Sequence, residues 1–299
     1  MMFKTFGLLF ITNILIMISI NIIVRIFGFD RYIVKGGIDF TALAGFCLIW
    51  GFIGSFISLF LSKTIAKMSM GVQEIDGRGQ FAGIYNSVQR LSRAAGIPMP
   101  EVGVYYSPEI NAFATGASQS NSLVAVSTGL LENMNSNEVD GVLAHEISHI
   151  ANGDMVRMTL IQGMVNAFGM FLARVIAYII ASFLGRSDDE ERGGGINYMV
   201  MWIATLILEN VFLFLGMFIV SYFSRVREFA ADEGGARLAG KANMIAALEN
   251  LRRNFDMEVD DRGASLASLK ISGRGWLALL STHPPLEDRI AALKSAKIK

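Results

Sequence analysis

The sequence is poor in charge and in cysteine, and each shortage excludes a class of protein. Charged residues make up 17% of the 299 positions, against about 25% in an average soluble domain. The 26 basic and 26 acidic residues cancel, so the chain offers no basic surface for nucleic acid. Its one cysteine, Cys47, excludes an internal disulfide and any multi-cysteine metal site. The apolar share of 53% is typical of a membrane protein.

The apolar residues are gathered in four long segments, at 5–24, 40–62, 155–184 and 196–223. Each segment is long enough to cross the roughly 30 Å hydrocarbon core as a helix. The first two are uncharged, whereas Arg174 and Glu209 interrupt the other two and must face each other, the bundle interior or a cavity. We predict two membrane hairpins, with partial insertion of the second as the alternative. A cleaved signal peptide is the alternative for the first segment, but no small-x-small cleavage pattern follows it.

An even number of spans separates the polar stretches, so they lie on the same side of the membrane and can fold together. The predicted parts are an N-terminal membrane hairpin, half of a soluble domain, a second hairpin and the other half of the soluble domain. Their bounds are 1–62, 63–154, 155–223 and 224–299. Basic residues flanking the spans are balanced between the two sides until Arg225 and Arg227 tip the count towards cytoplasmic termini.

The soluble stretches predict a domain of the α+β class. Apolar residues recur at helical spacing over 79–95, and a helix over 137–152 is capped by Asn135 or Ser136 and stopped by Gly153. Short apolar runs separated by turn residues predict a small antiparallel sheet from strands at 102–106, 112–115 and 123–127. Further helices are expected at 229–238, 243–253 and 286–294. The fold class is therefore a mainly helical membrane protein with one α+β domain.

Two of the three histidines, His145 and His149, lie four residues apart on the predicted helix 137–152. This spacing puts both imidazoles on one face, where they can bind a single Zn²⁺. Glu146 follows the first histidine and can reach a water molecule on the metal. The alternative is an ordinary amphipathic helix that exposes two histidines.

A catalytic zinc site needs a third protein ligand and an open fourth position. The best candidate is Glu228, directly after the last apolar segment, with Asp232 four residues further on the same helical face. We expect Glu228 to bind the metal and Asp232 to accept the free ring N–H of a ligand histidine. Such a pair is more often a solvated helix face, but its position at the membrane exit, on the side of the histidine helix, favours the metal site.

The third histidine, His283, precedes two prolines that hold back the last helix. Its side chain is a candidate hydrogen-bond donor to the oxyanion that forms when a peptide carbonyl is attacked. A capping or packing role is equally compatible with the sequence. Arg289 could stabilise the negative charge of the same oxyanion, or pair with Asp288 or Asp232.

These motifs resemble the HtpX-type membrane-bound zinc metallopeptidases, which are distant relatives of the prenyl-protein endopeptidases. The resemblance covers nearly the whole chain, including the four spans, and its motifs lie at 111–116, 145–154, 227–232 and 283–289. It implies a gluzincin-like protease domain with one Zn²⁺ on His145, His149 and Glu228, and Glu146 as general base. It further implies a bacterial inner-membrane enzyme of stress response and membrane-protein quality control, with its active site facing the cytoplasm.

The resemblance also implies that an edge strand takes up an extended substrate by β-augmentation. This substrate-binding strand is formed by Asn111, Ala112, Phe113, Ala114, Thr115 and Gly116. The expected substrates are unfolded or damaged membrane-protein segments beside the lipid bilayer. The expected reaction is hydrolysis of their peptide bonds.

Three other functions compete with a membrane-anchored zinc endopeptidase. A protease that cuts inside the bilayer is disfavoured because polar residues bracket the histidine motif within one membrane thickness. A transporter that uses Arg174 and Glu209 as a polar path leaves the histidines and Glu228 unexplained. A membrane-tethered holdase with a structural zinc is disfavoured by Glu146 and by the open fourth ligand position.

Overall fold

The computed structural model describes residues 33–34, 37–184, 198–261 and 281–298. The chain divides into two compact units, which combine Met1–Ser58 with Thr159–Val220 and Leu59–Met158 with Ser221–Lys299. The predicted first span at 5–24 and the polar loop between the later spans lie outside the described residues.

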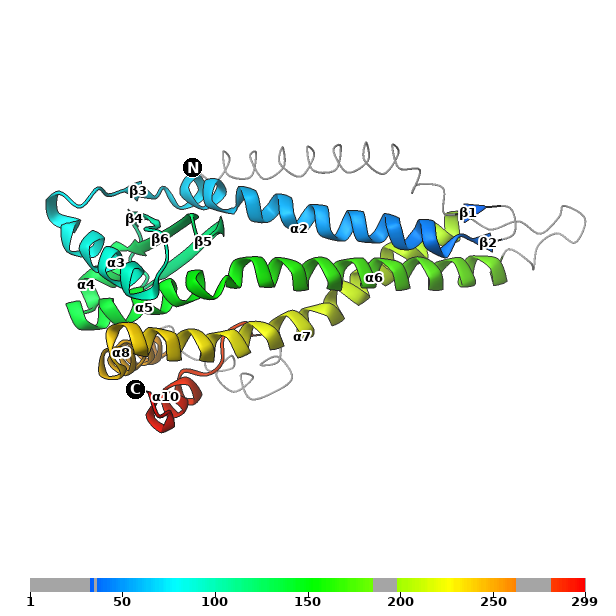
Figure 1. Cartoon of the computed structure of the whole chain (residues 1–299). Coiled ribbons are helices and arrows are strands. Elements are labelled where there is room, and N and C mark those ends of the chain that lie inside the picture. Colours follow the sequence, from blue (N-terminus) through cyan, green and yellow to red (C-terminus); the bar gives the residue numbers. More distant parts are fainter. Residues whose placement is uncertain (1–32, 35–36, 185–197, 262–280, 299) are drawn as a thin grey trace, which may run out of the picture. The chain divides into compact units, whose positions relative to one another are not determined.

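Three of the described helices are long and apolar enough to cross a membrane (Figure 1). They are α2 (Phe40–Met70), α6 (Asp154–Leu184) and α7 (Tyr198–Ala239), and two short strands, β1 (Ile33–Val34) and β2 (Gly37–Ile38), precede α2. Many large apolar side chains of these helices are exposed, such as Phe168 at 63% and Trp202 at 67%. This surface suits contact with lipid chains, and it agrees with the predicted membrane helices at 40–62, 155–184 and 196–223.

Small residues and one ion pair hold the membrane helices together within their unit. A Cβ atom on Gly51 of α2 would lie 2.8 Å from the carbonyl oxygen of Gly163 on α6, so this glycine permits a close helix crossing. Arg174 of α6 forms an ion pair with Glu209 of α7, and its guanidinium lies 4.8 Å from the ring centroid of Phe46. Of the three alternatives that the sequence left open for these two charges, the structure shows that they face each other.

The other unit contains a four-stranded sheet whose strand order is β3-β4-β6-β5. The strands are β3 (Gln73–Glu74), β4 (Glu101–Tyr105), β5 (Ala112–Ser118) and β6 (Asn121–Ser127). The prediction of a purely antiparallel sheet is wrong, because β4 and β6 pair in parallel. Strand β5 does not pair with β4 but lies at the edge of the sheet. Strand β6 lies between them, antiparallel to β5 and therefore parallel to β4.

Helices pack on this sheet and build the main core behind it. The helices of this unit are η1 (Gly79–Phe81), α3 (Ala82–Ala95), α4 (Thr128–Asn133), α5 (Ser136–Asn152), α8 (Lys241–Asp261) and α10 (Leu286–Ser295). Val124 and Val126 of the sheet pack with Leu91 of α3 and with Leu143 and Ile147 of α5. Helix α8 packs against α5, and α10 packs against α8. The mainly helical fold class with a small sheet is thus confirmed.

Both ends of α5 are fixed by local chemistry. At its start the Asn135 side chain accepts hydrogen bonds from the backbone N–H groups of Asn137 and Glu138, and the Glu138 carboxylate accepts the N–H of Asn135. At its end Gly153 has a φ of 67°, a left-handed conformation that favours glycine. Helix α5 is therefore a fixed support for the residues it carries.

Candidate active site

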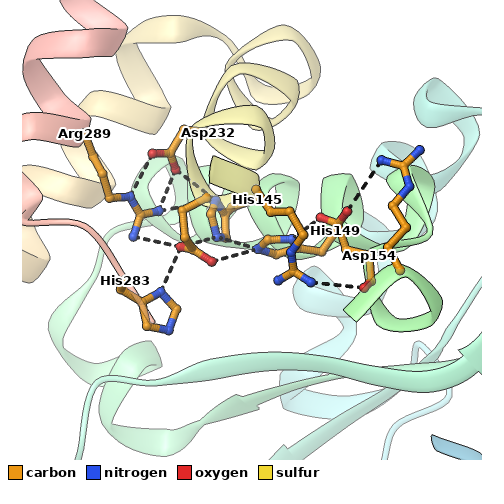
Figure 2. A network of polar contacts seen from close by, with 9 residues as sticks. His145, His149, Asp154, Asp232, His283 and Arg289 are labelled. Atoms are coloured by element: carbon orange, nitrogen blue, oxygen red, sulfur yellow. Dashed lines mark hydrogen bonds and ion pairs between the residues drawn. The ribbon is translucent and has the colours of Figure 1, made fainter. Parts of the chain in front are cut away.

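Helix α5 presents His145 and His149 on the same face (Figure 2). Leu143 and Ile147, which belong to the opposite side of the helix turn, are fully buried in the core and anchor α5. The two imidazoles meet edge to face, with their Nε2 atoms 3.1 Å apart. The predicted four-residue spacing therefore brings both ring nitrogens to one point.

Helix α7 brings Glu228 to the same point. Its Oε1 lies 3.4 Å from His149 Nε2, and its Oε2 lies 3.6 Å from His145 Nε2. Ligand atoms of the three residues all lie within 4.8 Å of one another, so they could hold one metal ion. Glu228 is only 2% exposed, although it follows a long apolar helix segment. The sequence stretch 224–228 interrupts the hydrophobic run but not the helix, because it contains neither glycine nor proline.

Two glycines allow α7 to approach α5 closely at the site. A Cβ on Gly234 would lie 2.0 Å from Ser148 Oγ, and one on Gly235 would lie 3.0 Å from the backbone nitrogen of His145. Larger residues would push α7 away from the histidine helix. The glycine pair therefore sets the distance across which Glu228 reaches the imidazoles.

Each histidine places its other ring nitrogen against a buried carboxylate. His145 Nδ1 lies 2.9 Å from Asp232 Oδ1, and His149 Nδ1 lies 2.7 Å from Asp154 Oδ2. Asp232 in turn accepts two hydrogen bonds from Arg289, at 2.8 and 2.6 Å. Of the partners that the sequence left open for Arg289, the structure selects Asp232.

The donor set fits a metal cation. When each Nδ1–H donates to its carboxylate, both Nε2 lone pairs point at the same position, which is unfavourable unless a cation lies between them. Glu228 Oε2 is buried without a well-formed hydrogen bond, although His283 Nδ1 and Arg289 Nη1 lie 2.9 and 3.2 Å away. Two imidazoles and one carboxylate are ligands that Zn²⁺ accepts, and they leave a fourth position open.

Without a metal, the pKa values of His145, His149 and Glu228 favour protonated histidines beside an ionised glutamate. Burial lowers the pKa of His149, but hydrogen bonds with Asp154 and Glu228 outweigh it and raise this pKa to about 9. The pKa of His145 is also raised, because Asp232 and Glu228 outweigh its burial. Burial raises the pKa of Glu228, yet its histidine neighbours hold that pKa well below its usual range. The metal-free site therefore attracts a positive charge.

Glu146 and His283 flank the cluster. Glu146 follows His145 on α5 and is partly buried, and its negative charge contributes to the raised pKa of both rings. His283 lies before α10 and is 65% exposed, with Nδ1 2.9 Å from Glu228 Oε2. The structure thus brings His283 to the cluster, against Glu228.

Strand β5, which contains most of the predicted substrate strand, lies at the edge of the sheet and packs against α5. Asn111 and Ser127 form a hydrogen-bonded pair, since the Ser127 N–H donates to the Asn111 carbonyl at 2.9 Å. Hydrogen-bonded and non-bonded pairs alternate along antiparallel strands. The backbone groups of Ala112 and Ala114 therefore point to the free edge.

The sequence analysis missed Asp154 and the glycine pair Gly234 and Gly235. The signal for Asp154 is Gly153, because a left-handed glycine turns the chain back towards the last turn of the helix. The glycine pair had a weaker signal, since two adjacent glycines inside a helix indicate close packing without naming the partner.

Two histidines on one helix, a carboxylate from a second helix as the third possible ligand, and a buried carboxylate behind each histidine are the arrangement expected of a metal-dependent peptidase site. The sequence profile of Peptidase family M48 matches residues 79–297. The chain therefore belongs to peptidase family M48 and is a membrane metallopeptidase.

Full-length relatives agree with this assignment. The chain is 46% identical over 300 residues to "Protease HtpX homolog" of Methylacidiphilum infernorum, with 98% of this chain and 99% of that protein covered. It is 47% identical over 297 residues to "Protease HtpX" of Shewanella oneidensis, with the same coverage. The crystal structure of S. mikatae Ste24p has the same fold, with a TM-score of 0.64 at 18% identity. That match covers 97% of this chain and 66% of Ste24p, just under two thirds of its length.

Proposed function

We propose that the chain is a zinc endopeptidase of the bacterial inner membrane that cleaves unfolded or damaged membrane-protein segments on the cytoplasmic side. One observation carries the proposal: His145, His149 and Glu228 converge within 4.8 Å, with Glu146 on the same helix as the histidines. The cytoplasmic side is supported by Arg225 and Arg227, which follow the apolar segment 196–223 and belong to the unit that carries the site.

In this proposal His145, His149 and Glu228 hold the ion, with Asp232 orienting His145 and Arg289 fixing Asp232. A bound Zn²⁺ polarises a peptide carbonyl and lowers the pKa of water to about 7. Glu146 takes the proton of the attacking water and passes it to the leaving amine. No covalent enzyme intermediate is required.

The substrate is held as an extended strand along the free edge of β5, over residues 111–116. The outward N–H and C=O groups of Ala112 and Ala114 pair with its backbone, which requires an unfolded segment but not a particular sequence. His283 donates a hydrogen bond to the oxyanion once its ring turns from Glu228, a movement that its exposure allows.

The decisive experiment compares the purified full chain with Glu146→Gln for cleavage of an unfolded membrane-protein substrate, after zinc content has been measured in both. We expect both to hold one zinc per chain and the variant to lose activity by about 10²–10⁴-fold. The matched control is Glu132→Gln, which changes an exposed glutamate of α4 and should leave activity unchanged.

Each other outcome of this experiment would contradict a different part of the proposal. If both proteins bind zinc and neither cleaves, the zinc is structural and the holdase alternative gains support. If both cleave equally, Glu146 is not the base or a contaminant supplies the activity. Cleavage within the apolar part of the substrate, and not outside it, would instead support an intramembrane protease.

A further inference from the structure

Asp154 has the contacts expected of a residue that orients His149. Its Oδ2 lies 2.7 Å from His149 Nδ1, and the residue is only 2% exposed. The opposite ring nitrogen of His149, Nε2, faces His145 and Glu228. A carboxylate at Nδ1 keeps the proton there, which leaves the Nε2 lone pair free for a metal and fixes the rotation of the ring.

The chain bends specifically to make this contact. In an uninterrupted helix, residue i+5 is rotated by about 140° from residue i, so Asp154 would face away from His149. Gly153 breaks the helix with its left-handed φ of 67°, and its N–H donates to the carbonyl of Ile150. Helix α6 then begins at Asp154, which is thereby brought back against the last turn of α5.

Helix α7 holds Asp154 from the other side. Arg227, the residue before Glu228, donates from Nη1 to the backbone carbonyl oxygen of Asp154 at 3.0 Å. Arg157 Nη1 lies 3.9 Å from Oδ1 of the Asp154 side chain and Arg157 is 66% exposed, so this ion pair contributes little to holding Asp154. The start of α6 is therefore tied to the helix segment that supplies the third ligand.

We propose that Asp154 is the positioning residue of His149, the counterpart of Asp232 for His145, and that Arg227 holds Asp154 in place. This proposal rests on the proposed metal site. It assigns each ligand histidine its own buried carboxylate, one from α6 and one from α7. Two of the three ligands then depend on residues at the start of α6 or in α7.

The test measures zinc affinity of the full chain by competition with a chromophoric chelator. Asp154→Asn keeps the shape but removes the charge, and we expect its affinity to fall by about 10–100-fold. Asp140→Asn is the matched control, because Asp140 lies on α5 but pairs with Arg90 and touches no histidine. Arg227→Gln should weaken zinc binding less than Asp154→Asn, since Arg227 contacts only the backbone of Asp154.

A spectroscopic readout separates positioning from general stability. With Co²⁺ in place of zinc, we expect the visible bands of Asp154→Asn to shift, and those of Asp140→Asn to match the wild type. If Asp154→Asn does not fold, ¹⁵N-histidine NMR of the zinc-loaded wild type replaces it. The NMR spectrum should show His149 protonated at Nδ1 and metal-bound at Nε2.

The failures are distinguishable. A wild type that binds no metal overturns the proposed function itself. A wild type that binds zinc, together with an Asp154→Asn variant of equal affinity and unchanged Co²⁺ bands, overturns only the role of Asp154. A His149 ring bound through Nδ1 would also overturn it.

Discussion

The close crossing of α7 and α5 can be tested at Gly234. A Cβ atom added there would lie 2.0 Å from Ser148 Oγ and 3.0 Å from Ser148 Cβ, whereas ordinary contact begins near 3.4 Å. Rotation of the serine hydroxyl relieves the first overlap but not the second. Helix α7 must therefore shift by several tenths of an ångström, and Glu228 and Asp232 shift with it.

The magnitudes decide which assay is informative. Overpacking costs about 1–3 kcal/mol, but alanine is about 1 kcal/mol more favourable than glycine inside a helix. Gly234→Ala should thus lower the free energy of unfolding by only about 0–2 kcal/mol. Zinc affinity should fall by about tenfold or more, because outer-shell disturbances of this kind have effects of 10–100-fold. Chelator competition is therefore the sensitive measurement.

Two further variants make this test sharp. Adding Ser148→Gly removes both Ser148 atoms that the new Cβ would meet and should restore part of the zinc affinity of Gly234→Ala. Gly83→Ala is the control, because a Cβ at this exposed position on α3 meets no atom within 4 Å. Wild-type affinity in Gly234→Ala, or no recovery in the double variant, would refute the packing argument.

Three more predictions follow from the charges and the sheet edge. The pKa of His149 is raised to about 9 in the metal-free chain, so its proton must leave when zinc binds. Calorimetry at about pH 7 in buffers of different ionisation enthalpy should therefore detect about one or more protons released per zinc. The apparent zinc affinity should rise with pH up to about 9. Zinc binding without proton release would contradict this pKa. Glu209→Leu leaves Arg174 unpaired and should destabilise the membrane-embedded protein by roughly 2 kcal/mol without loss of zinc; an unchanged melting temperature would show that the pair contributes nothing. Ala114→Pro removes an outward N–H of the edge strand and should raise KM, whereas Thr115→Pro removes an inward N–H and should destabilise the sheet; equal KM in Ala114→Pro and wild type would argue against substrate pairing on β5.

Much of the site could be predicted because helical spacing is a local property. His145 and His149 share a face of α5, and Glu228 and Asp232 share a face of α7, as their four-residue separations require. The capping box at Asn135 is equally local.

What could not be predicted depends on contacts between distant segments. The parallel pairing of β4 and β6 arises because β6 inserts beside a strand that ended many residues earlier, which the apolar pattern of short strands does not encode. Gly234 was not recognised because its partner Ser148 lies on another helix. Asp154 was missed because it follows the left-handed Gly153 at the end of α5. An uninterrupted helix would have directed its side chain away from His149.

X-ray absorption at the zinc edge tests the central claim most directly. The account predicts one zinc per chain bound only by nitrogen and oxygen at about 2.0–2.1 Å, with scattering from two imidazoles. In Glu228→Gln the zinc should be lost or its oxygen shell should change. A sulfur ligand at about 2.3 Å, or an identical spectrum and stoichiometry in Glu228→Gln, would contradict the assignment of the metal site.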